Sequence, residues 1–284
     1  MKILLPNHDF VIGDSAEVKG EMLYLFKKGD FKDVMYALTY EIFGDDECYY
    51  CHRKLRNHET QCNNQAYFSK ISMDHLIPQD FGGPTITNNL RPACTACNSR
   101  KGNMFEDEFY EFLKVYQEAI KTGNQELLER FREKLLARQE KRRKGKIPSL
   151  PAEWLADRSP RSIWVNYRIG EIKGGSYMRM LEDVAQYEYL IKPITVTANN
   201  VLVDGFNANL ISTIKDIPAL IIPMDNVVYS GYPYGERNIW TVGFPFQMLV
   251  WCLKREFFIF TKNSQKYLKE VLTIHPFGYN IYTV

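Results

Sequence analysis

The chain has 284 residues, of which 45% are apolar and 14% aromatic. That composition can form hydrophobic cores, which excludes a chain that is disordered throughout, and the length suits two domains or two domains and a small module. The formal net charge of +2 is nearly neutral, so charge alone neither indicates nor excludes nucleic acid as a partner.

Residues 1–47 are predicted to form an N-terminal segment with one helix. The apolar start at Met1–Leu5 is too short for a signal peptide, and no later stretch reaches the length of a membrane span. We therefore expect a soluble, cytoplasmic protein without a membrane partner. Apolar residues recur at helical spacing over Phe31–Phe43, and Gly44 is expected to end this helix.

The next segment, residues 48–105, contains two Cys-x-x-Cys pairs, Cys48 with Cys51 and Cys94 with Cys97. Thiolates at this spacing can both point into one tetrahedral zinc site, and two pairs complete a closed shell of sulfur ligands. We therefore predict a structural zinc ion in a module too small for a large core, rather than four unrelated buried thiols. Four similar residues are expected to be buried apolar thiols or surface histidines instead: Cys62, Cys252, His52 and His58.

The residues between and after these pairs follow a specific order: Asp74-His75, Gly82-Gly83, Asn89-Leu90, Asn98 directly after the second pair, and Lys101-Gly102 behind it. This order resembles the HNH endonuclease family over residues 48–103. The resemblance implies a ββα-metal fold, in which two antiparallel strands and a helix surround one catalytic metal ion. Because every element of the pattern is present, we expect an active nuclease.

By this resemblance His75 is the general base, Asp74 and Asn98 are ligands of a catalytic Mg²⁺ or Mn²⁺ ion, and Asn89 holds the loop that orients His75. An imidazole has a pKa near neutrality and can take a proton from water. A hard cation prefers oxygen ligands, which a carboxylate and a carboxamide supply. A buried structural histidine is the alternative for His75, and the surrounding pattern disfavours it.

A helical extension follows at residues 106–146. Apolar spacing predicts helices over Glu106–Thr122 and Gln125–Lys144, separated by Gly123-Asn124. The second helix ends in a basic run, which is either a solvated helix face or a contact to a DNA backbone. Both interpretations stay open for this run. The residues that we predict to contact DNA are Arg100, Lys101, Lys141, Arg142, Arg143 and Lys144.

Residues 147–160 contain three prolines and are predicted to be a linker. Residues 161–284 then alternate strands and helices, which indicates an α/β domain with a C-terminal extension. Strands are expected at 162–169, 193–197, 200–203 and 219–223, and helices at 176–186 and 207–214. The aromatic-rich extension is expected to contain helices near 245–254 and 264–272.

Part of this domain, residues 160–225, resembles the ParB/sulfiredoxin-like domains, with a less specific pattern. The shared features are a strand at Lys192-Pro193-Ile194, the turn Val203-Asp204-Gly205 and a following helix. In those families the residue or residues directly after the glycine are Arg or His-Arg, and these side chains hold a nucleotide phosphate. This chain has Phe206-Asn207 at the same place. We therefore expect a structural or DNA-positioning domain.

These features together predict an α+β chain: an HNH module with structural zinc and flanking helices, then a ParB/sulfiredoxin-like α/β domain and an aromatic-rich C-terminal segment. The predicted function is metal-dependent hydrolysis of DNA phosphodiester bonds. Cutting both strands would need two active sites, and for that case we expect a homodimer. Two alternatives stay open. One is a non-cleaving, zinc-dependent nucleic-acid-binding protein, which would not need Asp74, His75 and Asn98. The other is a nucleotide-responsive regulator that acts through Asp204–Asn209.

Overall fold

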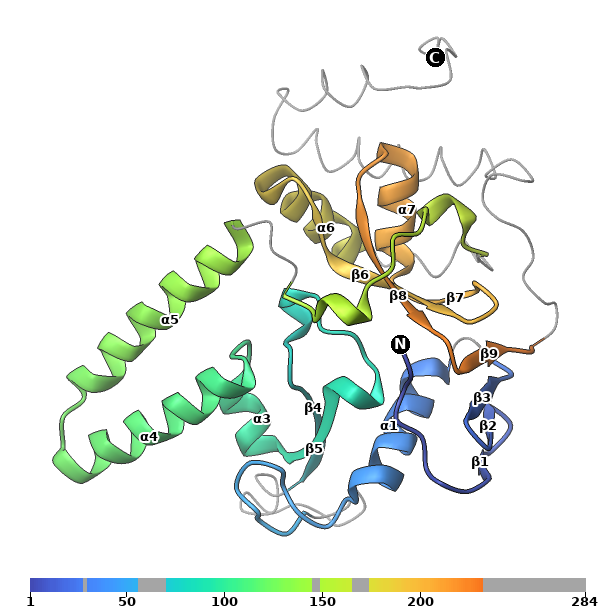
Figure 1. The fold of residues 1–284 in the computed structure, drawn as a ribbon. Coiled ribbons are helices and arrows are strands. Elements are labelled where there is room, and N and C mark those ends of the chain that lie inside the picture. Colours follow the sequence, from blue (N-terminus) through green and yellow to red (C-terminus); the bar gives the residue numbers. More distant parts are fainter. Residues whose placement is uncertain (28–29, 56–69, 145–148, 165–173, 232–284) are drawn as a thin grey trace.

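The computed structural model describes residues 1–27, 30–55, 70–144, 149–164 and 174–231, which form mixed helices and sheets (Figure 1). Their strands belong to a four-stranded, a two-stranded and a three-stranded sheet. The α+β class predicted from the sequence is therefore confirmed. Cys62, Cys252 and the helices predicted near 245–254 and 264–272 lie outside the described residues.

The N-terminal segment contains a small sheet that the apolar spacing does not predict. β1 (Phe10–Ile12), β2 (Ala16–Lys19) and β3 (Met22–Leu25) are consecutive antiparallel strands, and β9 (Val227–Tyr229) pairs with β3 in parallel. Strands of three or four residues are too short for an alternating pattern to stand out in a sequence. Residues far apart in the chain thus share one sheet, blue and orange in Figure 1.

Helix α1 (Phe31–Phe43) has the bounds predicted from its apolar spacing. Val34, Met35 and Leu38 on its inner face are fully buried. They belong to one core that also draws on β3, on the cysteine-rich module and on the C-terminal strands, through side chains such as Leu23, Met73, Leu90 and Val203. The N-terminal segment, the cysteine-rich module and the C-terminal strands therefore share this core, while two further clusters of buried residues lie within the C-terminal unit and around the cysteines.

The cysteine-rich module consists of two antiparallel strands and a helix, as the resemblance implies. They are β4 (Ile71–His75), β5 (Leu90–Cys94) and α3 (Thr95–Lys101). Two 3₁₀ turns, η2 (Gln79–Phe81) and η3 (Thr87–Asn89), connect the strands. In the pairing register His75 lies opposite Leu90, so Asp74 and His75 occupy the loop end of the hairpin, while Cys94 lies at the other end, opposite Ile71.

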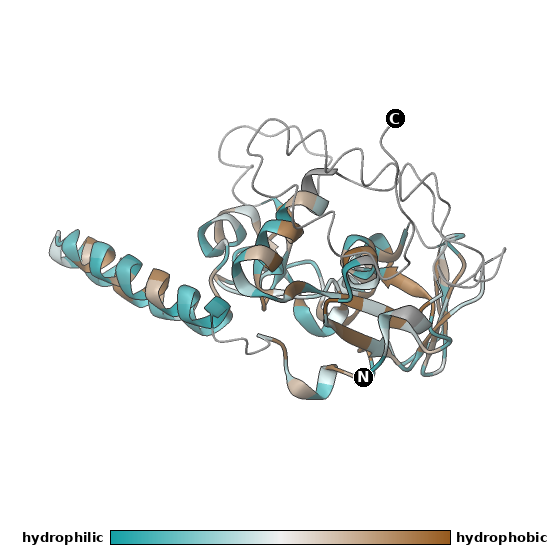
Figure 2. Ribbon diagram, turned by 90° about the horizontal axis from the view of Figure 1, so that it is seen from above, coloured by the Kyte–Doolittle hydropathy of each residue, from teal (hydrophilic) through white to brown (hydrophobic). Residues whose placement is uncertain are grey.

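Two long helices follow the module, α4 (Glu106–Thr122) and α5 (Glu126–Lys144). The predicted bounds of α4 are confirmed, and those of α5 differ by one residue. Gly123, with φ of +70°, makes the turn between them. The pair projects from the rest of the molecule and is mainly hydrophilic (Figure 2), which agrees with the polar faces expected of a surface hairpin.

The C-terminal unit alternates helices and strands in the predicted order: α6 (Gly174–Tyr187), β6 (Leu190–Thr197), β7 (Leu202–Asp204), α7 (Phe206–Lys215) and β8 (Ala219–Met224). Its sheet has the order β7-β6-β8. The strand predicted at 162–169 is not formed where it is described, because η5 (Pro160–Ser162) is a 3₁₀ turn and Trp164 makes a single bridge. Between the helical hairpin and η5 lies a short 3₁₀ turn, η4 (Ala152–Trp154).

None of the helices in the described part of the chain combines the length and the apolar composition needed to cross a membrane.

Candidate active site and zinc site

The four predicted zinc ligands lie together. Cys48 and Cys51 flank a turn before β4, Cys94 ends β5, and Cys97 lies in α3. Their sulfur atoms are all within 4.8 Å of one another, and the Sγ atoms of Cys51 and Cys94 are 3.8 Å apart. Tetrahedral zinc with Zn–S bonds of about 2.3 Å separates its sulfur ligands by about 3.8 Å. The cluster is therefore compatible with a structural zinc ion.

The cysteine turn also supplies a contact to the candidate catalytic residues. Tyr50 lies between two of the predicted zinc ligands, Cys48 and Cys51, and its hydroxyl donates a 2.6 Å hydrogen bond to Asp74 Oδ2. The Tyr50 ring packs edge-on against Phe109 of α4, with ring centroids 4.9 Å apart. Burial, together with the Asp74 carboxylate, raises the pKa of Tyr50, so the hydroxyl stays a donor. The zinc turn thus helps to hold Asp74 in place.

Asp74 and Lys101 form a buried ion pair. Their side chains are 3% and 0% exposed, and Lys101 Nζ lies 3.1 Å from Asp74 Oδ2. The same ammonium group donates a 2.7 Å hydrogen bond to the backbone oxygen of His75. Burial raises the pKa of Asp74 and lowers that of Lys101, while their mutual attraction opposes both shifts. Because Lys101 is buried, the phosphate contact predicted for it is wrong in this conformation.

His75 is held at one edge of its ring. Its Nε2 lies 3.0 Å from Thr85 Oγ1 and 3.2 Å from Gln79 Nε2. Burial, with a smaller contribution from the positive charge of Lys101, lowers the pKa of His75 to about 4. The imidazole is therefore neutral near pH 7 and can accept a proton.

The loop after His75 is tied to Asn89, which is fully buried. Asn89 Oδ1 accepts a hydrogen bond from the Ile77 amide, and its Nδ2 donates to the backbone oxygens of Ile77 and Pro84. A Cβ atom on Gly83 would lie 1.8 Å from the Ile77 oxygen, so only glycine fits there. These contacts give the loop one conformation and hence give His75 one orientation.

Asn98 lies on α3 and faces strand β4. Its Nδ2 donates to Ser72 Oγ at 3.2 Å and to the Met73 backbone oxygen at 3.1 Å. Arg100, two residues further on, is exposed and stacks over the Tyr116 ring of α4 at 5.4 Å. Asn98 is therefore bonded to the two residues of β4 that precede Asp74, and Arg100 remains at the surface.

The basic run at the end of α5 divides into two kinds of residue. Arg142 and Arg143 lie over the rings of Phe105 and Phe81, at 4.1 Å and 5.0 Å, and so attach the end of α5 to the module. Lys141 and Lys144 are exposed, and Lys144 pairs with Glu140 one turn earlier at 2.9 Å. The arginines thus have a packing role, and the lysines are the part of the run that faces solvent.

Three residues that contact the candidate site are absent from the sequence prediction: Tyr50, Gln79 and Thr85. For Tyr50 the sequence offers one signal, its position between Cys48 and Cys51, two of the predicted zinc ligands. Gln79 and Thr85 have no distinctive spacing, because their contact with His75 depends on how the loop folds back.

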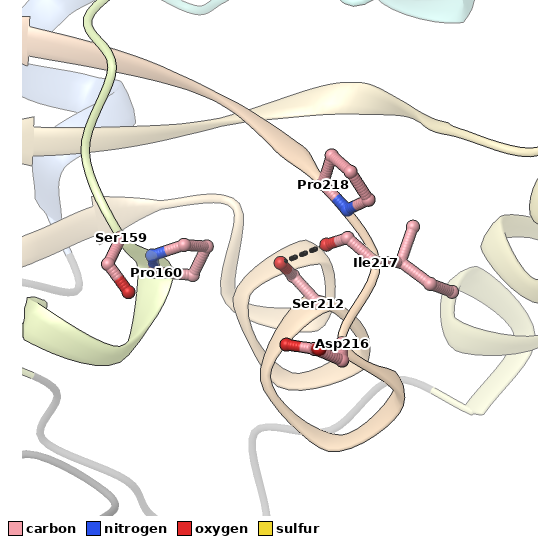
Figure 3. Close-up of a pocket in the computed structure, with 6 residues that line it drawn as sticks. All are labelled: Ser159, Pro160, Ser212, Asp216, Ile217 and Pro218. Atoms are coloured by element: carbon pink, nitrogen blue, oxygen red, sulfur yellow. Dashed lines mark hydrogen bonds between the residues drawn. The ribbon is translucent and has the colours of Figure 1, made fainter. Parts of the chain in front are cut away.

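A separate hollow lies in the C-terminal unit, between η5 and the end of α7 (Figure 3). In it the Ser212 hydroxyl donates a hydrogen bond to the Ile217 backbone oxygen. The hollow is lined by Ser159, Pro160, Ser212, Asp216, Ile217 and Pro218. None of the predicted site residues lines it, so it does not contribute to the candidate active site.

Comparison with known proteins agrees with the chemistry of the module. Residues 48–113 match the family described as HNH endonuclease, and this match covers 66 of the 284 residues. No curated protein and no solved structure matches the chain. The family match indicates possible nuclease activity for this segment. The resemblance of residues 160–225 to ParB/sulfiredoxin-like domains has no counterpart in these comparisons.

Proposed function

We propose that this chain is a metal-dependent HNH endonuclease that hydrolyses DNA phosphodiester bonds. The observation that carries the proposal is that Asp74 and His75 at the end of β4, and Asn98 of α3, which is bonded to β4 through the Met73 backbone oxygen, all lie inside the segment that matches the HNH endonuclease family. A protein that only binds nucleic acid would need the zinc cluster for folding, but it would not need this set of side chains.

His75 acts as the general base. Thr85 and Gln79 hold the Nε2 edge of the ring. For Nδ1 to take a proton from water, Nε2 has to carry the ring hydrogen and donate it to Thr85 Oγ1, with the Gln79 carboxamide turned so that its NH2 group does not face the same nitrogen. The depressed pKa of His75 keeps the imidazole unprotonated at working pH. Proton transfer to a positioned side chain typically contributes about 10²–10⁴-fold to a rate. Asn89 supports this step indirectly because it holds the loop on which Gln79 and Thr85 lie.

Asp74 and Asn98 would hold the catalytic metal ion. Their carboxylate and carboxamide oxygens suit Mg²⁺ or Mn²⁺, and Asn98 uses its Nδ2 to hold β4, which leaves its Oδ1 for a cation. Such an ion, when bound, neutralises charge on the scissile phosphate and lowers the pKa of a bound water. Because Lys101 contacts both oxygens of Asp74, the ion has to share this carboxylate with an ammonium group.

Plasmid DNA incubated with the full chain and Mg²⁺ or Mn²⁺ tests the proposal. We expect cut products with 3′-hydroxyl ends, and cleavage of both strands would require two sites and hence a homodimer. His75→Ala should slow cleavage by about 10²–10⁴-fold, while the exposed His8→Ala should cut at the wild-type rate. If His75→Ala cuts as fast as the wild type, His75 is not the base.

For the C-terminal unit, a structural or DNA-positioning role is the first candidate, and one observation favours a polar ligand as the second. Asn207, at the start of α7, is 9% exposed, and its Oδ1 has no hydrogen-bond partner within the described part of the chain. A nucleotide bound there would raise the melting temperature of the full chain. An unchanged melting temperature with each nucleoside triphosphate would remove the nucleotide-responsive alternative.

A further inference from the structure

The turn that carries Gln79 lies directly against the C-terminal unit. Gly82 ends this turn with φ of +83°, and a Cβ atom there would lie 2.4 Å from the backbone oxygen of Ile191 in β6. Glycine alone permits so close an approach in this backbone conformation. The first residues of β6 are therefore adjacent to the loop that holds His75.

Lys192, the next residue of β6, presents a partly exposed charge beside this loop. Its Nζ lies 3.3 Å from Asp204 Oδ1 at the end of β7, and the two side chains are 40% and 31% exposed. Ion pairs with this much solvent contact contribute little to stability. Asp204 Oδ1 also accepts a 2.7 Å hydrogen bond from the Gly205 amide, so the carboxylate stays in place when Lys192 turns to another anion.

Lys32, in the first turn of α1, is a second exposed cation, and its Nζ lies 5.2 Å from the centre of the Tyr36 ring. α1 packs against β5 and η3, and its Val34 and Met35 share a core with Leu90, which lies opposite His75. α1 therefore lies beside the end of the hairpin that carries His75, as does β6, which pairs with β7. All three elements lie outside the segment that matches the HNH endonuclease family.

We propose that Lys192 and Lys32 contact DNA phosphates next to the scissile one, so that the site is completed by β6 and α1 from outside the HNH segment. This inference rests on the proposed endonuclease function. A lysine is a compact charge on a flexible stem and can follow a backbone without reading its sequence. On binding, the Lys192 ammonium exchanges the Asp204 carboxylate for a phosphate oxygen.

Three cations in or against the module are already committed to protein contacts. Lys101 is buried against Asp74, and Arg142 and Arg143 lie over aromatic rings. Lys192 and Lys32 differ from them because their present contacts, a partly exposed ion pair and a single contact with a partly buried ring, are weak and can be given up.

The test measures DNA binding in the full-length His75→Ala chain, so that cleavage does not interfere. Fluorescence anisotropy of a labelled duplex gives Kd at several salt concentrations. Lys192→Gln and Lys32→Gln should each weaken binding and lower the slope of log Kd against log salt by about 0.9, the value for one phosphate contact. Asp204→Asn keeps the acceptor for Gly205 and frees Lys192, so it should bind DNA more tightly.

Lys121→Gln, at the exposed end of α4, is the matched control and should leave Kd and the slope unchanged. If Lys192→Gln behaves like this control, the inference is wrong. Cleavage by the wild-type chain is measured in parallel. If the wild type cuts and Lys192→Gln binds like the control, the proposed phosphate contact is wrong while the endonuclease proposal stands. If the wild type does not cut but Lys192→Gln lowers the slope, the endonuclease proposal fails while the contact stands.

Discussion

Asp74, a residue of the candidate active site, and Lys101 form a pair of charges removed from water. Each buried charge carries a desolvation cost of several kcal/mol, which is offset only when the pair is close and its remaining atoms are hydrogen-bonded. Here Tyr50 donates to the carboxylate, and the ammonium group also reaches the His75 backbone oxygen. Loss of one member would leave the other charge buried without compensation.

We expect Lys101→Met to lower the free energy of unfolding by about 3–5 kcal/mol at pH 7, because the Asp74 carboxylate loses its buried counter-ion. The double variant Asp74→Asn/Lys101→Met should cost less than the sum of the single variants, since neither charge is then left alone. Urea unfolding of the full chain, followed by circular dichroism, measures these changes. A cost for Lys101→Met as small as that of the exposed Lys121→Met would contradict the buried pair.

At this scale the sequence predicts residues whose identity and spacing are themselves informative, such as His75 and Asn89. It cannot predict the burial of Lys101, since a lysine on a short helix beside a nuclease motif is ordinarily a surface residue. Its position is decided by the packing of α3 on β4, which directs the side chain toward Asp74. The contact of Thr85 with His75 is not predictable for a similar reason, because it forms only when the loop between β4 and β5 folds back on His75.

Among the elements, those of the cysteine-rich module are short, and their cysteine cluster is compatible with a structural zinc ion. β4 and β5 have five residues each and α3 has seven, and elements this short are not stable by themselves. Cys48, Cys94 and Cys97 are among the buried residues of its core, so the sulfur cluster occupies the place of larger apolar side chains. Zinc binding and folding of the module are therefore expected to be coupled.

Cys94→Ser should lose the bound zinc and destabilise β4, β5 and α3. Cys94 supplies one of the four sulfur atoms and also caps α3, because its Sγ accepts a hydrogen bond from the Cys97 amide. Zinc content by plasma mass spectrometry and hydrogen exchange of residues 71–101 measure the two effects. Exchange should become much faster in this variant, and also in the wild-type chain after treatment with a strong chelator.

Cys62→Ser is the matched control, because Cys62 belongs to neither Cys-x-x-Cys pair. It should retain one zinc ion per chain and wild-type exchange. Full zinc content with unchanged exchange in Cys94→Ser would show that the four sulfur atoms do not hold the metal.

The elements differ in how well the sequence predicts them. Helices α1 and α4 have 13 and 17 residues, long enough for their apolar faces to repeat several times, and their bounds are confirmed. β1, β2 and β3 have three or four residues each and were not predicted. Their stability comes from pairing with one another and from the core beneath them, which a local pattern does not contain.

For the whole molecule, residues near the two ends of the described chain are held together by Asn226. Its side chain is buried, accepts a hydrogen bond from the Ile3 amide at 2.9 Å and donates to the Ile3 oxygen at 3.1 Å. Its own backbone oxygen accepts from the Leu23 amide. This residue therefore links the N-terminal segment to the strand pair β3–β9.

Asn226→Ala should lower the free energy of unfolding by about 1–3 kcal/mol, because it leaves buried backbone groups of Ile3 without their partner. Denaturant unfolding of the full chain gives the value, and hydrogen exchange of residues 10–25 shows whether the N-terminal sheet opens with it. The neighbouring Asp225→Ala removes a side chain that is 58% exposed and should cost less. Equal costs for the two variants would contradict the linking role of Asn226.

The sequence by itself determined the cluster of four cysteines, the order of the HNH-like residues, the long helices and the alternating C-terminal unit. Each of these is encoded by residues close together in the chain, through spacing or helical periodicity. The tertiary structure alone decided that Lys101 is buried on Asp74, that β9 completes the N-terminal sheet, and that β6 lies against the turn beside His75. These contacts join residues distant in sequence, and they form because separate apolar faces are buried in shared cores, which no local pattern specifies.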